Sequence, residues 1–136
     1  MYRKGDVAES ILRPLRKACL ELPEAFEEPA WLGTRWKIRT RTFAHVLRIE
    51  DGRPESYSKV SGVDETAVVL TFRAAEDEVA ALSASGLPFF LPGWWPNIVG
   101  LILDGTIDDE EIAELITDSY CILAPKKCAA LVHGDA

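Results

Sequence analysis

The chain has 136 residues, of which 48% are hydrophobic and 27% are charged. This length and apolar content suit a single domain over residues 1–136 and disfavour a disordered chain. Fifteen Lys and Arg against twenty-two Asp and Glu give a net charge of −7, which as a bulk figure argues against a phosphate-binding surface. The charge is unevenly distributed along the chain, however. Residues 34–60 carry seven basic and three acidic side chains, whereas residues 61–124 carry one basic and twelve acidic side chains.

The N-terminal residues, the most apolar tract and the cysteines each bear on where the protein is located. The first residues, Met1-Tyr2-Arg3-Lys4, lead into a polar stretch where a secretory signal would have an apolar core. The most apolar tract, residues 87–103, is interrupted by prolines and glycines and cannot form a spanning helix. Cysteine occurs three times with no closely spaced pair, at Cys19, Cys121 and Cys128. We therefore expect free thiols, a cytoplasmic location and no membrane partner.

The first element in chain order is a helix with apolar residues at steps of three and four from Ile11 to Leu22, ended by Pro23. Asp6, with Glu9 three residues later, is a candidate capping box. An interior proline costs about 3 kcal/mol, so the helix either starts at Pro14 or is kinked there.

Strands are predicted next. Residues 36–39 and 42–47 form a hairpin joined at Thr40-Arg41, without the glycine that such turns usually contain. Residues 51–62 are polar and turn-rich. Residues 66–72 are apolar on both faces and rich in β-branched side chains, which predicts a buried strand.

The second half completes an α+β pattern. A helix over residues 76–83, stopped by Gly86, and a strand over 98–103 precede a helix that begins at Asp108, with Glu111 as capping partner. Pro125 ends that helix, and residues 126–131 can add another turn or two. We predict a two-layer α+β sandwich with one antiparallel sheet of about four to five strands. An N-terminal helix, a middle helix and one or two C-terminal helices lie on one side, and residues 1–5 and 132–136 fray.

Catalytic motifs are missing from the sequence. It has two histidines, His45 and His133, and neither a Ser–His–Asp order, a phosphate loop nor a dinucleotide fingerprint. Residues 108–111 are all acidic, which suits the first turn of a helix; a divalent-cation site is the alternative. We expect a non-enzymatic protein without metal or cofactor.

Basic residues alternate along the predicted hairpin. In an extended strand, alternate side chains share a face, so the cations would line one face while Trp36 and Ile38 point into the core. If the chain turns at Thr40-Arg41, two arginines lie at the hairpin tip instead. A cationic ribbon can bind DNA phosphates, although it can also be a solvated face or a protected sheet edge. The candidate nucleic-acid contacts are Arg35, Lys37, Arg39, Arg41, Arg53 and Lys59.

Aromatic residues form the second unusual feature, concentrated in the segment from Phe89 to Trp95. With two tryptophans from earlier in the chain, they can line an apolar pocket or partner-binding patch, or can simply close one end of the core. The candidate pocket residues are Trp31, Trp36, Phe89, Phe90, Trp94 and Trp95.

Several segments together resemble the MmcQ/YjbR-like family of small bacterial proteins, over nearly the whole chain. The segments are residues 19–24 (CLELPE), residues 36–39 (WKIR) with Phe43-Ala44, Gly93-Trp94, residues 100–104 (GLILD), residues 114–120 (ELITDSY) and residues 124–127 (APKK). The most specific block contains Ser119-Tyr120. We expect this pair to pack the last helix and not to perform chemistry.

The resemblance implies a domain related to frataxin-like and secretion-chaperone-like folds, and DNA binding through a "double-wing" motif. The wings would be the hairpin around residues 39–41 and the loop over residues 51–59. The leading hypothesis is therefore a non-enzymatic DNA-binding protein. The alternative is a protein- or small-ligand-binding module that uses the Phe89–Trp95 loop.

Overall fold

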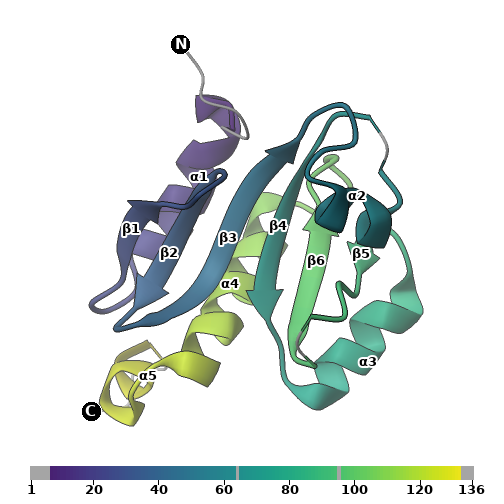
Figure 1. Cartoon of the computed structure of the whole chain (residues 1–136). Helices are drawn as coiled ribbons and strands as arrows, with labels where there is room; N and C mark the ends of the chain where they lie inside the picture. Colours follow the sequence, from purple (N-terminus) through teal and green to yellow (C-terminus); the bar gives the residue numbers. More distant parts are fainter. Residues whose placement is uncertain (1–6, 64, 95, 133–136) are drawn as a thin grey trace.

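The computed structural model describes residues 7–63, 65–94 and 96–132, and Figure 1 shows how its elements are arranged. The elements are α1 (Glu9–Leu20), β1 (Phe26–Pro29), β2 (Thr34–Ile38), β3 (Arg41–Ile49), α2 (Glu55–Ser61), β4 (Ala67–Arg73), α3 (Glu76–Ser85), β5 (Phe89–Phe90), β6 (Ile98–Ile102), α4 (Asp109–Leu123) and α5 (Lys126–Val132). The Asp6 cap and the predicted frayed ends lie outside the described residues, except that Val132 belongs to α5.

The strands form one antiparallel sheet in the order β1-β2-β3-β4-β6-β5. Helices pack against this sheet, which confirms the predicted α+β class. The described residues contain six strands, one more than the upper number expected. The additional strands are β1, which the charged sequence around it hides, and the two-residue β5, which lies in a segment predicted as a loop.

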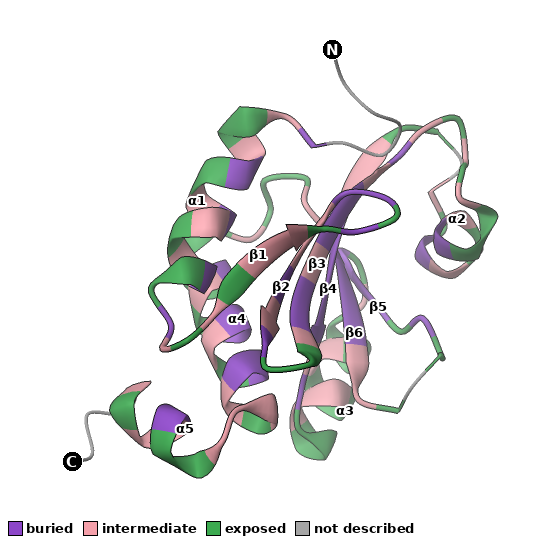
Figure 2. Ribbon diagram, turned by 60° about the vertical axis from the view of Figure 1, so that its left-hand side comes forward, coloured by how far each residue is buried: buried purple, intermediate pink, exposed green. Residues whose placement is uncertain are grey.

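One face of the sheet is covered by α1 and α4 (Figure 2). The main hydrophobic core lies between this face of the sheet and the two helices, and it includes fully buried Trp36, Ile38 and Tyr120. Arg35 and Lys37, the alternate residues of β2, are only partly buried and point to the other face. This alternation confirms the expected division of β2 into a core face and a cationic face.

The ends of α4 lie where local sequence signals predict them, whereas α1 departs from expectation at Pro14. Asp108 caps α4 by accepting a hydrogen bond from the backbone N–H of Glu111 at 2.8 Å, and α4 ends just before Pro125, as predicted. Helix α1 runs through Pro14 without starting there. Five residues of α1 precede this proline, so only a short first segment of helix is affected by its missing N–H.

The other face of the sheet is only partly covered. A second, smaller core forms where α2 packs on it, and comprises Leu32, Leu47, Ile49, Tyr57, Val69 and Phe90. The prediction of a turn-rich stretch over residues 51–62 was wrong in part, because α2 occupies most of it. The helix was hard to recognise because only Tyr57 and Ser61 are buried among its seven residues.

The β2–β3 hairpin turns at Arg39-Thr40, one residue earlier than predicted. Arg39 has a φ of 58°, in the left-handed region that glycine usually occupies in such turns. Arg39 therefore takes the role of the missing glycine, and the turn carries its guanidinium at the tip of the hairpin.

Candidate ligand-binding site

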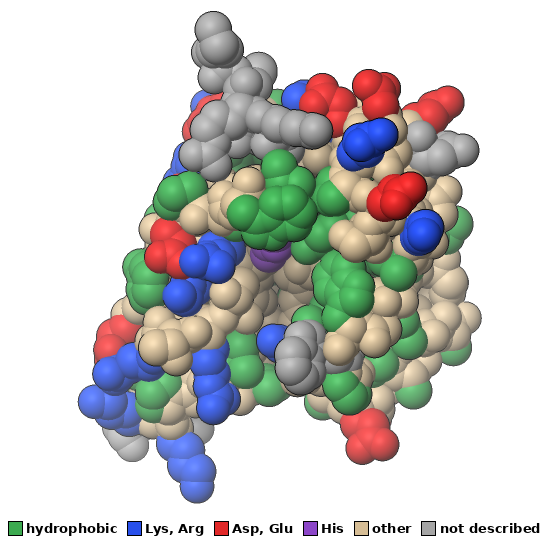
Figure 3. Space-filling view, viewed as in Figure 1, with side chains coloured by type: hydrophobic (Ala, Val, Ile, Leu, Met, Phe, Trp, Pro, Cys, Tyr) green, Lys and Arg blue, Asp and Glu red, His purple; other side chains and the backbone are tan. Residues whose placement is uncertain are grey.

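A pocket of about 230 Å³ lies on the open face of the sheet, beside α2. Figure 3 shows this hollow with a histidine at its base and apolar side chains on either side. The histidine is His45, since His133 lies outside the described residues. The pocket extends across β2, β3 and β4 to Trp94 and Ile98 in the segment between β5 and the end of β6.

Strand register builds the floor of the pocket. Arg35 of β2 lies opposite His45 of β3, His45 opposite Thr71 of β4, and Thr71 opposite Gly100 of β6. Cross-strand partners point to the same face, so these residues form one row across the open side of the sheet. Phe90 of β5 lies opposite Gly100, with its ring where a Cβ at position 100 would be.

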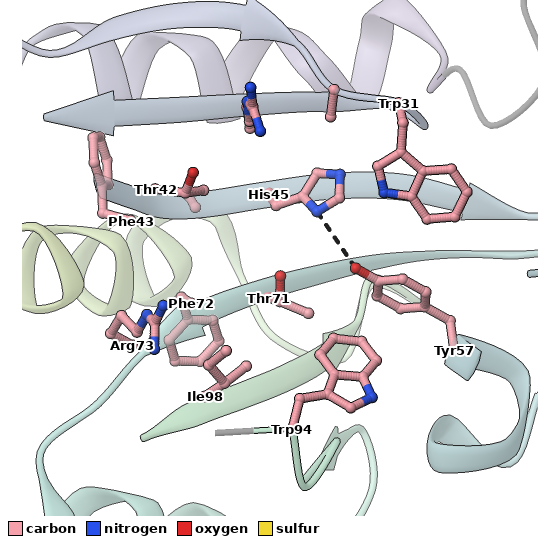
Figure 4. Close-up of a pocket in the computed structure, with 13 residues that line it drawn as sticks. Trp31, Thr42, Phe43, His45, Tyr57, Thr71, Phe72, Arg73, Trp94 and Ile98 are labelled. Atoms are coloured by element: carbon pink, nitrogen blue, oxygen red, sulfur yellow. Dashed lines mark hydrogen bonds between the residues drawn. The ribbon is translucent and has the colours of Figure 1, made fainter. Parts of the chain in front are cut away.

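A bulge in β3 widens this polar floor. Thr42 and His45 are separated by three positions, so a regular strand would place them on opposite faces. The pairing of β2 with β3 skips Phe43, whose ring packs edge-on against Tyr120 of α4 with centroids 5.4 Å apart. This extra residue brings Thr42 and His45 to the same side of the sheet (Figure 4).

His45 is held by hydrogen bonds at both ring nitrogens. Its Nε2 lies 2.7 Å from the carbonyl oxygen of Leu32, and because a carbonyl can only accept, Nε2 carries the proton. Its Nδ1 lies 3.4 Å from the hydroxyl of Tyr57, which then donates the weaker bond (Figure 4). The ring is thereby fixed as one neutral tautomer.

Burial shifts the protonation of this pair. It lowers the pKa of His45, and nearby Arg35 lowers it further, although the bond to Leu32 works in the opposite direction. Burial also raises the pKa of Tyr57 to about 12. Both side chains are therefore uncharged at neutral pH, and the middle of the pocket is polar without being ionic.

Two tryptophans flank this pair. The side chain of Trp31, in the turn between β1 and β2, is 71% exposed, and Trp94 is 41% exposed. Trp94 packs edge-on against Tyr57 with ring centroids 4.8 Å apart. Figure 4 shows the two indoles on either side of the His45–Tyr57 pair. The pocket therefore has an aromatic end that solvent can reach.

The opposite end of the pocket carries Arg73, the last residue of β4 (Figure 4). Its Nη1 donates to the side-chain oxygen of Asn97 at 2.8 Å, a neutral partner, and the described residues offer it no ion pair. Burial and the neighbouring Arg41 both lower the pKa of Arg73. Two guanidinium groups thus lie near each other without a described carboxylate between them.

Half of the predicted nucleic-acid contacts form ion pairs, with two glutamates shared among three cations. Glu28 of β1 pairs with both Arg35 and Lys37, the latter at 3.3 Å, and Glu24 pairs with Arg39 at 3.1 Å. These glutamates lie within residues 21–33, which carry four acidic side chains and no basic ones. Figure 3 shows Lys and Arg side chains gathered at the β1–β3 edge of this face, with acidic side chains among them.

The remaining three candidates are not brought together. Arg41 begins β3, whereas Arg53 and Lys59 follow its end, and Lys59 lies in α2 and not in a loop. At about 3.3 Å per residue, the nine residues of β3 put Arg41 and the start of the second predicted wing roughly 26 Å apart. Lys59 lies in α2, which packs back onto the sheet with Tyr57 against His45 in the middle of β3. None of the three has an ion pair within the described part of the chain.

The predicted aromatic cluster is divided between the two faces of the sheet. Trp36 is fully buried on the helical side, where its indole N–H donates to Glu27 at 2.9 Å. Phe89 joins the main core and Phe90 the smaller one. Trp31 and Trp94 line the pocket, and Trp95 lies outside the described residues.

The Ser119-Tyr120 pair packs α4 against the sheet. Ser119 donates to the carbonyl oxygen of Phe43 at 2.6 Å and accepts from the backbone N–H of Arg73 at 2.8 Å. The Tyr120 hydroxyl donates to the carbonyl oxygen of Pro23. Both side chains are fully buried, as expected for a packing role. Ser119 links α4 by hydrogen bonds to β3 and β4, two of the strands that line the pocket.

Sequence reasoning missed Tyr57, Thr71 and Arg73, and treated His45 only as a packed or edge residue. The signal for two of them is present in β4. Thr71 and Arg73 are the polar residues of an otherwise apolar strand, and they are two residues apart, so they share one face of the sheet. Tyr57 had no such signal, because it reaches the pocket from a helix that the sequence did not predict.

The described residues form neither a metal-binding cluster nor a membrane-spanning helix. No group of three or more His, Cys, Asp or Glu among them is placed to hold a metal ion, and this includes residues 108–111. None of their helices is long and apolar enough to cross a membrane. Cys19, Cys121 and Cys128 are free thiols, as predicted.

Fold and site together define an α+β protein with one sheet face covered by α1 and α4, and with an aromatic and cationic pocket on the other, partly covered face. A family model described as YjbR matches residues 20–122, from the last residue of α1 to near the end of α4. The chain therefore belongs to the YjbR family, which confirms the resemblance found in the sequence. No curated protein matches the chain.

Proposed function

We propose that this YjbR-family protein is a binding protein whose site is the pocket on the open face of the sheet. The observation that carries the proposal is the placement of Trp31 and Trp94 on either side of the His45–Tyr57 pair. Exposed indoles around a polar floor supply apolar contact area together with a few fixed hydrogen-bonding groups, as small-ligand sites require.

Binding without catalysis is favoured by the chemistry of the lining. The described lining residues include neither a carboxylate nor a thiol. His45 would be the candidate base, but both of its ring nitrogens are engaged by Leu32 and Tyr57. A ring held in this way is suited to shaping a site and not to moving protons.

The proposal can be tested by titrating the labelled protein with neutral aromatic fragments such as indole and following backbone amide NMR signals. We expect shifts at Ala44, His45 and Thr71, and at least a tenfold loss of affinity in Trp94→Ala, because one aromatic wall is removed. Leu91→Ala is the matched control, since Leu91 is similarly exposed in the same segment but does not line the pocket. If no fragment shifts these signals, the proposal is wrong.

Nucleic-acid binding through the cationic hairpin is a second candidate function. The observation in its favour is that Arg41 and Arg73 line the same surface hollow, with no described carboxylate paired to either. Phosphate groups would relieve the repulsion between these two guanidinium groups. The ion pairs of Arg35, Lys37 and Arg39 place this candidate second.

A salt series with a short labelled DNA duplex, followed by fluorescence anisotropy, tests this candidate. If Arg41 contacts a phosphate, Arg41→Ala should weaken binding and reduce the slope of log affinity against log salt by about one. Arg13→Ala removes the same charge from exposed α1, on the covered side of the sheet, and should leave the slope unchanged. Equal effects of the two variants, or no binding at low salt, would rule out this role.

A further inference from the structure

We infer that the ligand of the sheet-face pocket is a small planar aromatic anion, with its ring between Trp31 and Trp94 and its acid group on Arg73. This inference rests on the proposed function and goes further by assigning the chemical class of the ligand. It follows from the size of the cavity, the separation of its aromatic and cationic ends, and the lack of a described carboxylate partner for Arg73.

The pocket is open to solvent on one side, and its enclosed space suits one ring system. Its volume of about 230 Å³ is below the roughly 300–1,000 Å³ typical of pockets for drug-sized molecules. A planar ring is favoured because Trp31 and Trp94 approach the middle of the pocket from two sides, and stacking or edge contacts with indoles reward flat ligands. Thr71 and the uncharged His45–Tyr57 pair form the floor beneath such a ring.

Strand geometry sets the spacing between the two ends. Thr71 lies directly opposite His45 in the row across the sheet, and Arg73 lies two residues further along β4 on the same face. Two residues of strand span about 7 Å, a distance comparable to the length of one aromatic ring and its acid group. A ring held over His45 and Tyr57 can therefore direct an anionic substituent toward Arg73.

Arg73 is a better anion site than the other arginine of the lining. The Nε of Arg35 donates to Glu28 at 2.7 Å, so this guanidinium already has a carboxylate partner, which it shares with Lys37. Within the described residues, the guanidinium of Arg73 has the neutral side chain of Asn97 as its hydrogen-bond partner and forms no ion pair, and Arg73 lines a hollow together with Arg41. An anion at this end would gain charge-assisted hydrogen bonds from Arg73 and face no described carboxylate in the lining.

Calorimetric or NMR titrations of two matched ligand pairs test the inference: benzoate against benzamide, and phenyl phosphate against phenol. We expect the anion of at least one pair to bind about tenfold or more tightly than its neutral partner, as charge-assisted hydrogen bonds provide. A preference in the first pair identifies a carboxylate ligand, and a preference in the second identifies a phosphate ligand.

Variants connect the preference to one residue. Arg73→Gln should remove the preference for the anion while leaving binding of the neutral partner, which also shows that the pocket remains folded. Arg73→Lys should restore part of the preference, and Arg13→Gln, an equal charge change on α1, should not affect it. Equal binding of anion and neutral partner in both pairs overturns the inference but leaves the proposed function standing. If no member of either pair binds and neutral fragments also fail, both are wrong.

Discussion

At the scale of single residues, His45 shows how surroundings determine the chemistry of a side chain. On the sequence it is a lone histidine in a strand, and nothing nearby in the chain indicates its role. In the fold its Nε2 donates to the carbonyl oxygen of Leu32, its Nδ1 accepts from Tyr57, and burial lowers its pKa. A potential base thereby becomes a neutral part of the pocket floor.

This arrangement predicts a specific pH dependence of stability. Because the pKa of His45 is lowered in the folded state, the unfolded chain binds a proton more readily as pH falls below about 6.5. The free energy of unfolding should therefore decrease from about pH 7 to about pH 5.5, as measured by urea unfolding. His45→Gln, which cannot titrate, should show a clearly smaller decrease over the same range. An equal decrease would mean that His45 does not carry the effect.

At the scale of elements, the turn between β1 and β2 places two parts of the site. The backbone N–H of Ala30 donates to the carbonyl oxygen of Gly33 at 3.1 Å, which closes the turn around Trp31 and Leu32. Gly33 has a φ of 73°, and a Cβ there would lie 2.0 Å from the carbonyl oxygen of Val46 in β3. The turn can therefore pack this closely only because position 33 has no side chain.

We predict that Gly33→Ala destabilises the protein by about 3 kcal/mol or more, since both the backbone conformation and the contact with β3 oppose a side chain. Gly62→Ala is a matched control, because Gly62 has a φ of 77° but a Cβ there would meet nothing within 4 Å. Its cost should be limited to about 1 kcal/mol of backbone strain. Chemical denaturation of both variants measures the difference, and similar costs would show that the contact with Val46 is unimportant.

At the scale of the whole molecule, the net charge of −7 hides local compensation. The cations of β2 pair with glutamates before and within β1, although these acids lie in a different charge block of the sequence. Many of the other acids lie on α4, which covers the opposite side of the sheet from the pocket. We therefore expect Glu24 and Glu28, more than the acids of α4, to control how the hairpin interacts with a polyanion.

Removing these two acids should expose the cations that they neutralise. We predict that Glu24→Gln combined with Glu28→Gln makes the protein elute from a heparin column at higher salt than the wild type. Glu110→Gln combined with Glu114→Gln changes the net charge equally on exposed positions of α4, and should shift elution much less. Equal shifts would show that total charge, and not the ion pairs of the hairpin, controls polyanion binding.

Much of the fold could be predicted because its signals are local. The capped start of α4, the apolar run of β4 and the alternation of Trp36 and Ile38 with the cations of β2 depend on neighbours in the chain. The α2 helix and strands β1 and β5 were missed because they are short, so few residues carry their signal. Propensity is weakest in such elements.

The sequence by itself determined the α+β class, the family, the core face of β2 and the packing role of Ser119-Tyr120. Only the tertiary structure decided the site, because strand register and one bulge place Arg35, His45 and Thr71 in a row on an open face. It also showed that half of the predicted cations are paired with acids. The physical reason is that helix and strand signals extend over a few residues, whereas pockets and ion pairs join side chains that are distant in the chain.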